Sequence, residues 1–168
     1  MKKLLSIVIL CSTVFAALNG NLFVNDTKTF EIRMPDSWSQ NIQNTRKEVV
    51  FVRGDGISEI AVDIIPMSPK QANAGMVAKD QVIAYDGWQY VAGREMAWNE
   101  KHGADSAFSV MYNKNILNRY SPQTRIIAQE FYFVKARQVY VVTLITDSER
   151  WNEAKSGLLS ALESFKIY

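Results

Sequence analysis

The stretch Val139-Tyr140-Val141-Val142-Thr143-Leu144-Ile145 is apolar at nearly every position. Because alternate residues of a strand point to opposite faces of a sheet, an unbroken apolar run predicts a strand that is covered on both faces. A second apolar run, Phe131 to Val134, precedes it and is separated from it by only residues 135–138. That spacing suits an antiparallel hairpin. The pair therefore predicts the centre of an antiparallel sheet.

Further strands are predicted along the chain from alternating or apolar patterns. Residues 29–34 alternate and stop at Pro35, so their apolar members should face the core. Residues 48–53 and 59–64 flank Gly54-Asp55-Gly56, which is typical of a hairpin turn. The remaining predicted strands are residues 95–99, 107–112 and 125–134.

Two helices are predicted. Ser68-Pro69-Lys70-Gln71 has the pattern of a capping box with proline at the first helical position, and Gly87 closes this segment. The second helix should begin near Asp147-Ser148 and lie on the sheet. The apolar stripes are Ala74, Val77, Ala78, Val82 and Tyr85 in the first helix, and Trp151, Ala154, Leu158, Leu162 and Phe165 in the second. The element order predicts an α+β fold, a largely antiparallel sheet with helices packed on it.

The first residues predict the compartment. Lys2 and Lys3 precede an apolar run that ends with small residues at Val14 and Ala16. This pattern is typical of a secretory signal peptide over residues 1–16, leaving residues 17–168 as a single domain that is periplasmic or secreted. Lipidation at Cys11 and retention as a membrane anchor remain alternatives, and we expect membrane contact only if the signal is retained.

Removal of this segment changes the charge and the cysteine content. The chain has 19 Lys and Arg against 17 Asp and Glu, so loss of Lys2 and Lys3 leaves equal numbers and a net charge of zero. With equal numbers of basic and acidic residues, the sequence gives no support for nucleic acid as a partner. The only cysteine, Cys11, also leaves, so we expect neither a disulfide nor a thiolate nucleophile in the mature domain.

Two parts of the sequence resemble a known family. Pro35-Asp36-Ser37-Trp38, after an early strand, resembles the P-x-x-W signature of PsbP-like proteins, and so does the strand pair followed by a helix and Ser164-Phe165-Lys166-Ile167. The resemblance covers roughly residues 23–168 and implies an α/β/α sandwich that mostly docks onto other proteins. The photosynthetic branch has metal sites that use histidine, and these do not transfer because His102 is the only histidine.

No pattern predicts catalysis or a cofactor. Glu100, His102 and Asp105 place one imidazole between two carboxylates on a predicted loop, but zinc sites usually have more nitrogen or sulfur ligands. We therefore expect a solvated polar turn. The chain has no G-x-S-x-G elbow and no glycine-rich phosphate loop, and any catalytic triad must use His102. We expect a protein that is not an enzyme, with a weak metal-dependent hydrolase centred on His102 as an alternative.

Two segments are candidates for binding a partner protein. Trp88 and Tyr90 follow Gly87, where exposed aromatic rings would anchor a partner, although core packing is the competing role. Residues 113–125 form a long predicted connection with three basic residues and no acidic one, and the alternative is a longer hairpin with a solvated tip. The candidates in this second segment are Lys114, Arg119, Tyr120 and Arg125.

These observations predict an exported accessory protein without cofactors that docks to an envelope protein. The alternative is a small-molecule-binding module that uses a gap between sheet and helix near Trp88 and Trp98.

Overall fold

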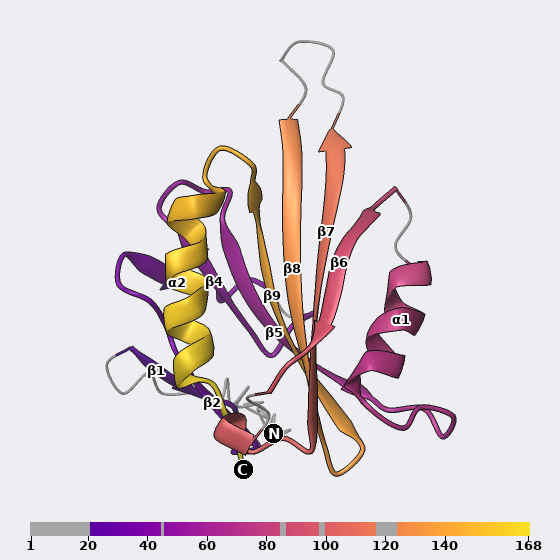
Figure 1. The fold of residues 1–168 in the computed structure, drawn as a ribbon. Coiled ribbons are helices and arrows are strands. Elements are labelled where there is room, and N and C mark those ends of the chain that lie inside the picture. The colour runs from indigo at the N-terminus through magenta and orange to yellow at the C-terminus, as the bar shows by residue number, and fades with distance from the viewer. Residues whose placement is uncertain (1–20, 45, 85–86, 98–99, 117–123) are drawn as a thin grey trace, which may run out of the picture.

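The computed structural model of the chain describes residues 21–44, 46–84, 87–97, 100–116 and 124–168. They form two antiparallel sheets with two helices (Figure 1). In chain order the elements are β1 (Leu22–Val24), β2 (Phe30–Arg33), β3 (Trp38–Gln40), β4 (Val49–Arg53), β5 (Glu59–Pro66), α1 (Ala74–Ala84), β6 (Gln89–Glu95), the 3-10 turn η1 (Glu100–His102), β7 (Ser106–Ile116), β8 (Thr124–Lys135), β9 (Gln138–Asp147), α2 (Trp151–Ser164) and β10 (Lys166–Ile167).

The larger sheet has the strand order β3-β4-β5-β9-β8-β7-β6, and every neighbouring pair is antiparallel. Strand β9 lies in its middle, paired with β5 on one edge and with β8 on the other. This confirms the prediction that residues 139–145 form a central strand. The smaller sheet has the order β1-β2-β10.

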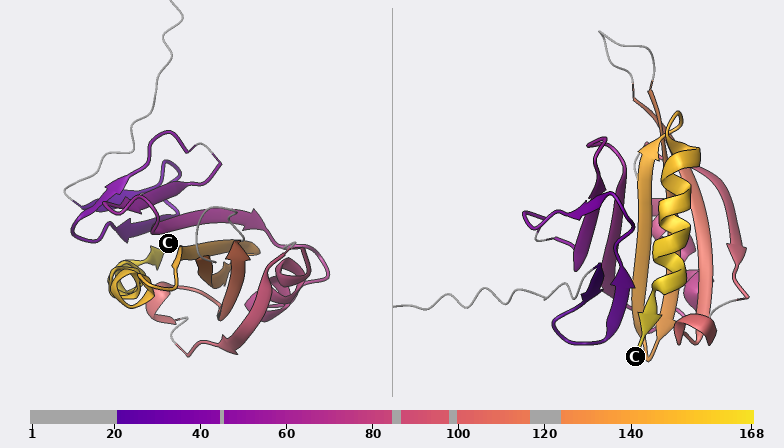
Figure 2. Two further views of the ribbon diagram at one scale, coloured as in Figure 1. Left: turned by 90° about the horizontal axis from the view of Figure 1, so that it is seen from above. Right: turned by 90° about the vertical axis from the view of Figure 1, so that its left-hand side faces the viewer.

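The two helices cover opposite faces of the larger sheet, as the view from above in Figure 2 shows. On the face called here the α2 face, α2 and the smaller sheet share one core with the larger sheet. On the other, the α1 face, α1 contacts β6, β7 and β8. Alternate residues of β8 and β9 enter the two cores, with Phe131, Phe133, Tyr140, Val142 and Leu144 on the α2 face and Tyr132, Val134, Val139 and Val141 on the α1 face. The predicted α+β class is confirmed.

Helix α1 begins at Ala74, five residues after the proline where the capping box predicted its start. The Ser68 N–H does donate to Gln71 Oε1 at 2.8 Å, as in a capping box, but Ser68 and Gln71 form an isolated turn. The cap of the actual helix is Asn73, whose Oδ1 accepts a hydrogen bond from the Met76 N–H at 3.0 Å. An Asn side chain at this position satisfies an otherwise unpaired amide of the first turn.

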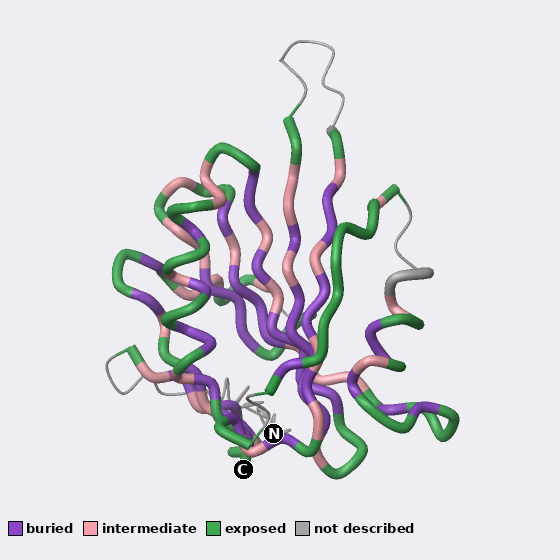
Figure 3. Tube along the Cα trace, in the orientation of Figure 1, coloured by how far each residue is buried: buried purple, intermediate pink, exposed green. Residues whose placement is uncertain are grey.

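The predicted strand at 95–99 is wrong at residues 96 and 97, because β6 ends at Glu95, and residues 98 and 99 lie outside the described residues. Strand β6 instead occupies residues 89–95, where the sequence predicted no element before residue 95. Strand β6 is the edge of the sheet and is exposed at every residue, which Figure 3 shows along its length. An edge strand that buries neither face needs no apolar alternation, so its sequence carries little signal. The short strands β1, β3 and β10 were also not predicted.

The two ends of the predicted loop at 113–125 are instead strand. Residues 113–116 continue β7 and Thr124 and Arg125 begin β8, in register from Asn113↔Ile127 to Ile116↔Thr124. These ends extend beyond the other strands at the top of Figure 1. The structure therefore favours the longer hairpin that was the alternative, and residues 117–123 lie outside the described residues.

No helix within the described residues has the length and apolar character needed to span a bilayer. The predicted signal segment, 1–16, and the candidate Trp98 lie outside those residues.

Candidate binding cavity

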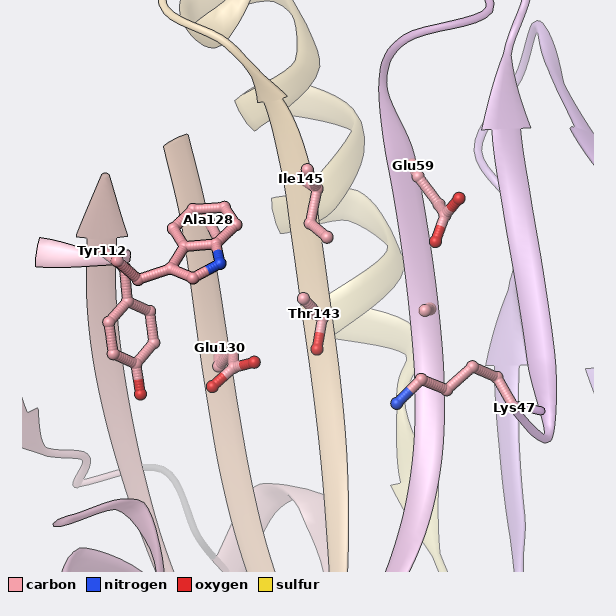
Figure 4. Close-up of a pocket in the computed structure, with 9 residues that line it drawn as sticks. Lys47, Glu59, Tyr112, Ala128, Glu130, Thr143 and Ile145 are labelled. Carbon is pink, nitrogen blue, oxygen red and sulfur yellow. The ribbon is translucent and has the colours of Figure 1, made fainter. Parts of the chain in front are cut away.

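A cavity of about 190 Å³ opens on the α1 face of the larger sheet. It lies over four adjacent strands, β5, β9, β8 and β7, beside the part of this face that α1 covers. Figure 4 shows Glu130 and Thr143 on neighbouring strands, with Tyr112 on one flank and Glu59 and Lys47 on the other. We refer to it as the α1-face cavity.

Small side chains on the sheet produce the hollow. The strand register places Ala61 and Glu130 on either side of Thr143, and places Ala128 beside Ile145 in the next row. Residues paired across antiparallel strands lie on the same face with their side chains about 5 Å apart. Two alanines and a threonine at such positions leave a depression that leucine or phenylalanine would fill.

Two carboxylates line the cavity. The Glu130 side chain is only 6% exposed and its Oε2 accepts a hydrogen bond from the Tyr132 hydroxyl at 2.5 Å. Burial raises the pKa of Glu59, and the charge of Lys47 partly opposes that rise. Lys47 itself pairs with Asp63, with 2.5 Å between Nζ and Oδ2. The positive charge at the rim is therefore already matched by a carboxylate.

Aromatic rings form the opposite wall. Trp88 and Tyr112 meet edge to face, with ring centroids 6.5 Å apart and planes at 72°. Lys114 places its Nζ 6.0 Å from the centroid of the Trp88 ring, within the range of a cation–π contact. Because Lys114 precedes Asn115, the register partner of Arg125, Trp88 lies near the projecting end of the β7–β8 hairpin.

The predicted partner-binding residues are placed in different environments. Trp88 is half-buried against the α1-face core, which agrees with the packing role, whereas Tyr90 on β6 is 55% exposed. Lys114 is half-buried on β7 and Arg125 is exposed on β8. The structure brings Trp88 and Lys114 together. Arg119 and Tyr120 lie outside the described residues.

The environment of His102 differs from the solvated turn that the sequence suggested. Its side chain is fully buried, and Nδ1 donates to the backbone oxygen of Phe165 at 2.7 Å. The ring packs against Phe133, with centroids 5.0 Å apart, while Glu100 and Asp105 are exposed. Burial lowers the pKa of His102, against the opposing effect of that hydrogen bond. Within the described ranges, no three His, Cys, Asp or Glu side chains group together as metal ligands.

Sequence reasoning did not single out Glu59, Glu130 or Thr143. A signal for two of them was present, because Glu130 directly precedes the apolar run 131–134 and Thr143 interrupts the run 139–145. A polar residue within a buried run needs a partner or a cavity. Their juxtaposition with Glu59 depends on the strand order, which the sequence did not supply.

The arrangement of sheets and helices matches solved structures of low sequence identity. Cyanobacterial PsbP from Synechocystis sp. PCC 6803 superposes with a TM-score of 0.56 at 13% identity, over 92% of this chain and 99% of that one. The chain has the PsbP-like fold. The Ran-binding protein Mog1p of Saccharomyces cerevisiae shares this PsbP-like fold, with a TM-score of 0.56 at 10% identity over 90% of this chain and 96% of Mog1p.

A third solved structure also shares the PsbP-like fold. LpqN of Mycobacterium tuberculosis, described as involved in cell envelope biogenesis, has a TM-score of 0.56 at 12% identity and covers 82% of each chain. No sequence-family description matches the chain, and no curated protein sequence does so either. At these identities the likeness establishes the fold.

Proposed function

We propose that this chain is an exported, non-catalytic accessory protein that docks to an envelope protein through the edge of its larger sheet. The observation that carries the proposal is the exposed strand β6, where Tyr90 is 55% and Val91 is 47% exposed. Exposed apolar side chains at a sheet edge promote aggregation of an isolated protein, and they are buried when a partner binds there.

The neighbouring residues have the composition of an interface. Lys114 lies close to Trp88, and Arg125, paired with Asn115, lies at the same projecting end of β7 and β8 with its side chain on the other face of the sheet. Tyrosine, tryptophan and arginine are enriched where proteins bind one another, within a polar surround. The docking surface of this proposal is Trp88, Tyr90, Val91, Lys114 and Arg125.

The comparisons support a binding role under the same proposal. One protein of this fold is described as Ran-binding and another as involved in cell envelope biogenesis. The predicted signal segment at residues 1–16 adds an extracytoplasmic location. No candidate nucleophile was found in the sequence beside an activating base, and the buried His102 hydrogen-bonds a backbone oxygen, so binding is favoured over catalysis.

Capture of an envelope partner by the purified protein tests this function. In a Tyr90→Ala, Arg125→Ala double variant, we expect affinity for the partner to fall by about 1–2 kcal/mol, or about 5–30-fold. The matched control is Ile42→Ala, Arg46→Ala, which removes an exposed apolar side chain and an arginine near β3, at the opposite edge of the sheet. Equal capture by both variants and the parent would refute docking through β6.

A further inference from the structure

The α1-face cavity combines negative charge with aromatic walls, and we propose that it binds a small organic cation. The ligand class is an ammonium group, primary or quaternary, attached to an apolar group about as large as a benzene ring. This binding goes beyond the proposed function, and it shares one residue with the docking surface at β6, because Trp88 also lines the cavity.

Charge is the first support. Two carboxylates, Glu59 and Glu130, line the cavity against one lysine, Lys47, whose charge is shared between Asp63 and Glu59. A carboxylate held out of water is costly unless an opposite charge or hydrogen bonds compensate it. Glu130 is 94% buried on the cavity wall and its Oε2 accepts a hydrogen bond from the Tyr132 hydroxyl, so a bound cation would add an opposite charge beside a carboxylate that is already held in place.

The placement of the two carboxylates suits one small ligand. Glu130 pairs with Thr143 of β9, and Glu59 pairs with Ile145, which follows Thr143 by two residues on β9. With standard strand spacing and rise, the Cα atoms of the two glutamates are about 12 Å apart. Glu130 lies beside Thr143 on one side of the cavity and Glu59 lies on the other, so a small ligand fits between them (Figure 4). The Thr143 hydroxyl lies between them and can accept an ammonium hydrogen.

The aromatic wall and the volume define the rest of the ligand. Indole and phenol rings attract cations over their faces, and such contacts strengthen when water is excluded. Trp88 already has a cation, the Lys114 ammonium, 6.0 Å from its ring centroid. An apolar cavity of about 150 Å³ accommodates benzene. The 190 Å³ available here therefore admits a ring of that size with its ammonium group.

A hollow on the opposite face of the sheet serves as an internal contrast. On the α2 face, a groove of about 350 Å³ has Arg94 and Lys155 among its lining residues and no acidic residue. Its charge is opposite to that of the α1-face cavity. An organic anion and an organic cation of equal size should therefore prefer different faces of the same sheet.

The experiment is titration of the protein with benzyltrimethylammonium, benzylammonium, benzyl alcohol and benzoate, followed by calorimetry and by the Trp88 indole N–H signal in NMR. We expect the two cations to bind with Kd of about 1 mM or tighter, and the alcohol at least about tenfold more weakly. The Trp88 signal should shift with the cations and not with benzoate. Trp88→Phe assigns that signal.

Variants separate charge from shape. Glu59→Gln, Glu130→Gln keeps both side-chain sizes and should weaken cation binding about tenfold or more. Ala128→Leu should block the cavity sterically for the cation and the alcohol alike. The matched control, Glu48→Gln, Glu163→Gln, removes two exposed carboxylates elsewhere and should leave Kd unchanged.

Three results would overturn the proposal. They are no saturable binding of either cation to the parent protein, equal affinity for benzyl alcohol and the cations, and unchanged cation affinity in both the glutamine double variant and Ala128→Leu. Thermal unfolding of each variant shows that it is folded before titration. A failure of docking through β6 does not change these outcomes, because Glu59, Ala128 and Glu130 lie outside the docking surface and Trp88→Phe is used only to assign the NMR signal.

Discussion

Trp38 of β3 packs against α2, where a glycine in the helix leaves space for its ring. The Trp38 side chain is 8% exposed, and a Cβ added at Gly157 would lie 2.9 Å from its indole nitrogen. Trp38→Ala should therefore lower the free energy of unfolding by about 3–5 kcal/mol, the usual loss for a large buried ring. Urea unfolding measures this, with Ile42→Ala as the exposed control. An unchanged midpoint would show that the ring contributes no packing.

His102 should make stability depend on pH. Burial lowers the pKa of His102 in the folded chain below its ordinary value of 6.5. As the pH falls, the histidine of the unfolded chain therefore takes up a proton near pH 6.5, whereas the folded chain does so only at a lower pH. Stability from the neutral, buried imidazole is therefore complete above pH 6.5. It is lost as pH falls below it, with a slope of at most about 1.4 kcal/mol per pH unit.

Urea unfolding between about pH 5 and 8, where histidine titrates, tests this slope. His102→Gln keeps a donor for Phe165 and lacks the titration, so its stability should change less with pH over that range. The raised pKa of Glu59 gives a dependence of opposite sign, lost as pH rises, and it is present in both proteins. Parallel pH profiles would show that His102 takes up its proton equally in both states.

These two residues also show what the sequence can reveal at this scale. The burial of Trp38 can be inferred from the sequence, because large aromatic side chains are mostly buried and this one follows a strand that ends at a proline. The burial of His102 was not, because the backbone oxygen that accepts its hydrogen bond belongs to Phe165, 63 residues later. The charged residues on both sides of the histidine predicted an exposed side chain, but its contacts with Phe133 and Phe165 bury it.

At the scale of elements, the start of α1 gives a prediction that distinguishes two caps. Asn73→Ala removes the acceptor of the Met76 N–H and should cost about 1 kcal/mol. Ser68→Ala should cost less, because the hydrogen bonds that hold the Ser68–Gln71 turn use the backbone of Ser68. Thermal unfolding of the two variants measures the difference. A larger loss for Ser68→Ala would restore the helix start predicted from the sequence.

Elements with a buried face were predictable, and exposed ones were not. The central hairpin β8–β9 and the stripe of α2 follow from apolar patterns, and Ala154, Leu158 and Leu162 are buried as expected. Strand β6 buries neither face, and the ends of β7 and β8 carry polar residues, so pattern recognition assigned both regions to loops. The same exposure makes these regions the docking surface proposed above.

Residues 113–125 carry a further prediction at this scale. Arg119→Ala, Tyr120→Ala should leave the melting temperature unchanged, because residues between strands contribute little to stability. Binding to a captured envelope partner should weaken by about 1–2 kcal/mol or more if either residue is a central anchor. Undiminished capture would exclude these two residues from the interface. A large loss of stability would instead assign them to packed core.

At the scale of the whole molecule, the cavity shows why a site can remain unpredicted even when the strands that form it are predicted correctly. Glu59 and Glu130 come from β5 and β8, which meet only through β9 between them. Each strand was placed from its own apolar pattern, but no local pattern specifies the order of strands in a sheet. The resemblance to PsbP-like proteins predicted the α/β/α layers. The positions of the two carboxylates follow only from the register of β9 with β5 and β8.

The last prediction concerns the length of the mature chain. Val14 and Ala16 provide the small-residue pattern for cleavage, so the exported protein should begin near Ala17. The first strand, β1, begins at Leu22, and Phe23 is the first core residue among those described, so residues 17–168 expressed directly should melt at the same temperature as the exported form. Mass spectrometry of the exported protein identifies its first residue. A chain lipidated on Cys11, or one of full length held in the membrane, would contradict cleavage and place the docking surface beside a bilayer.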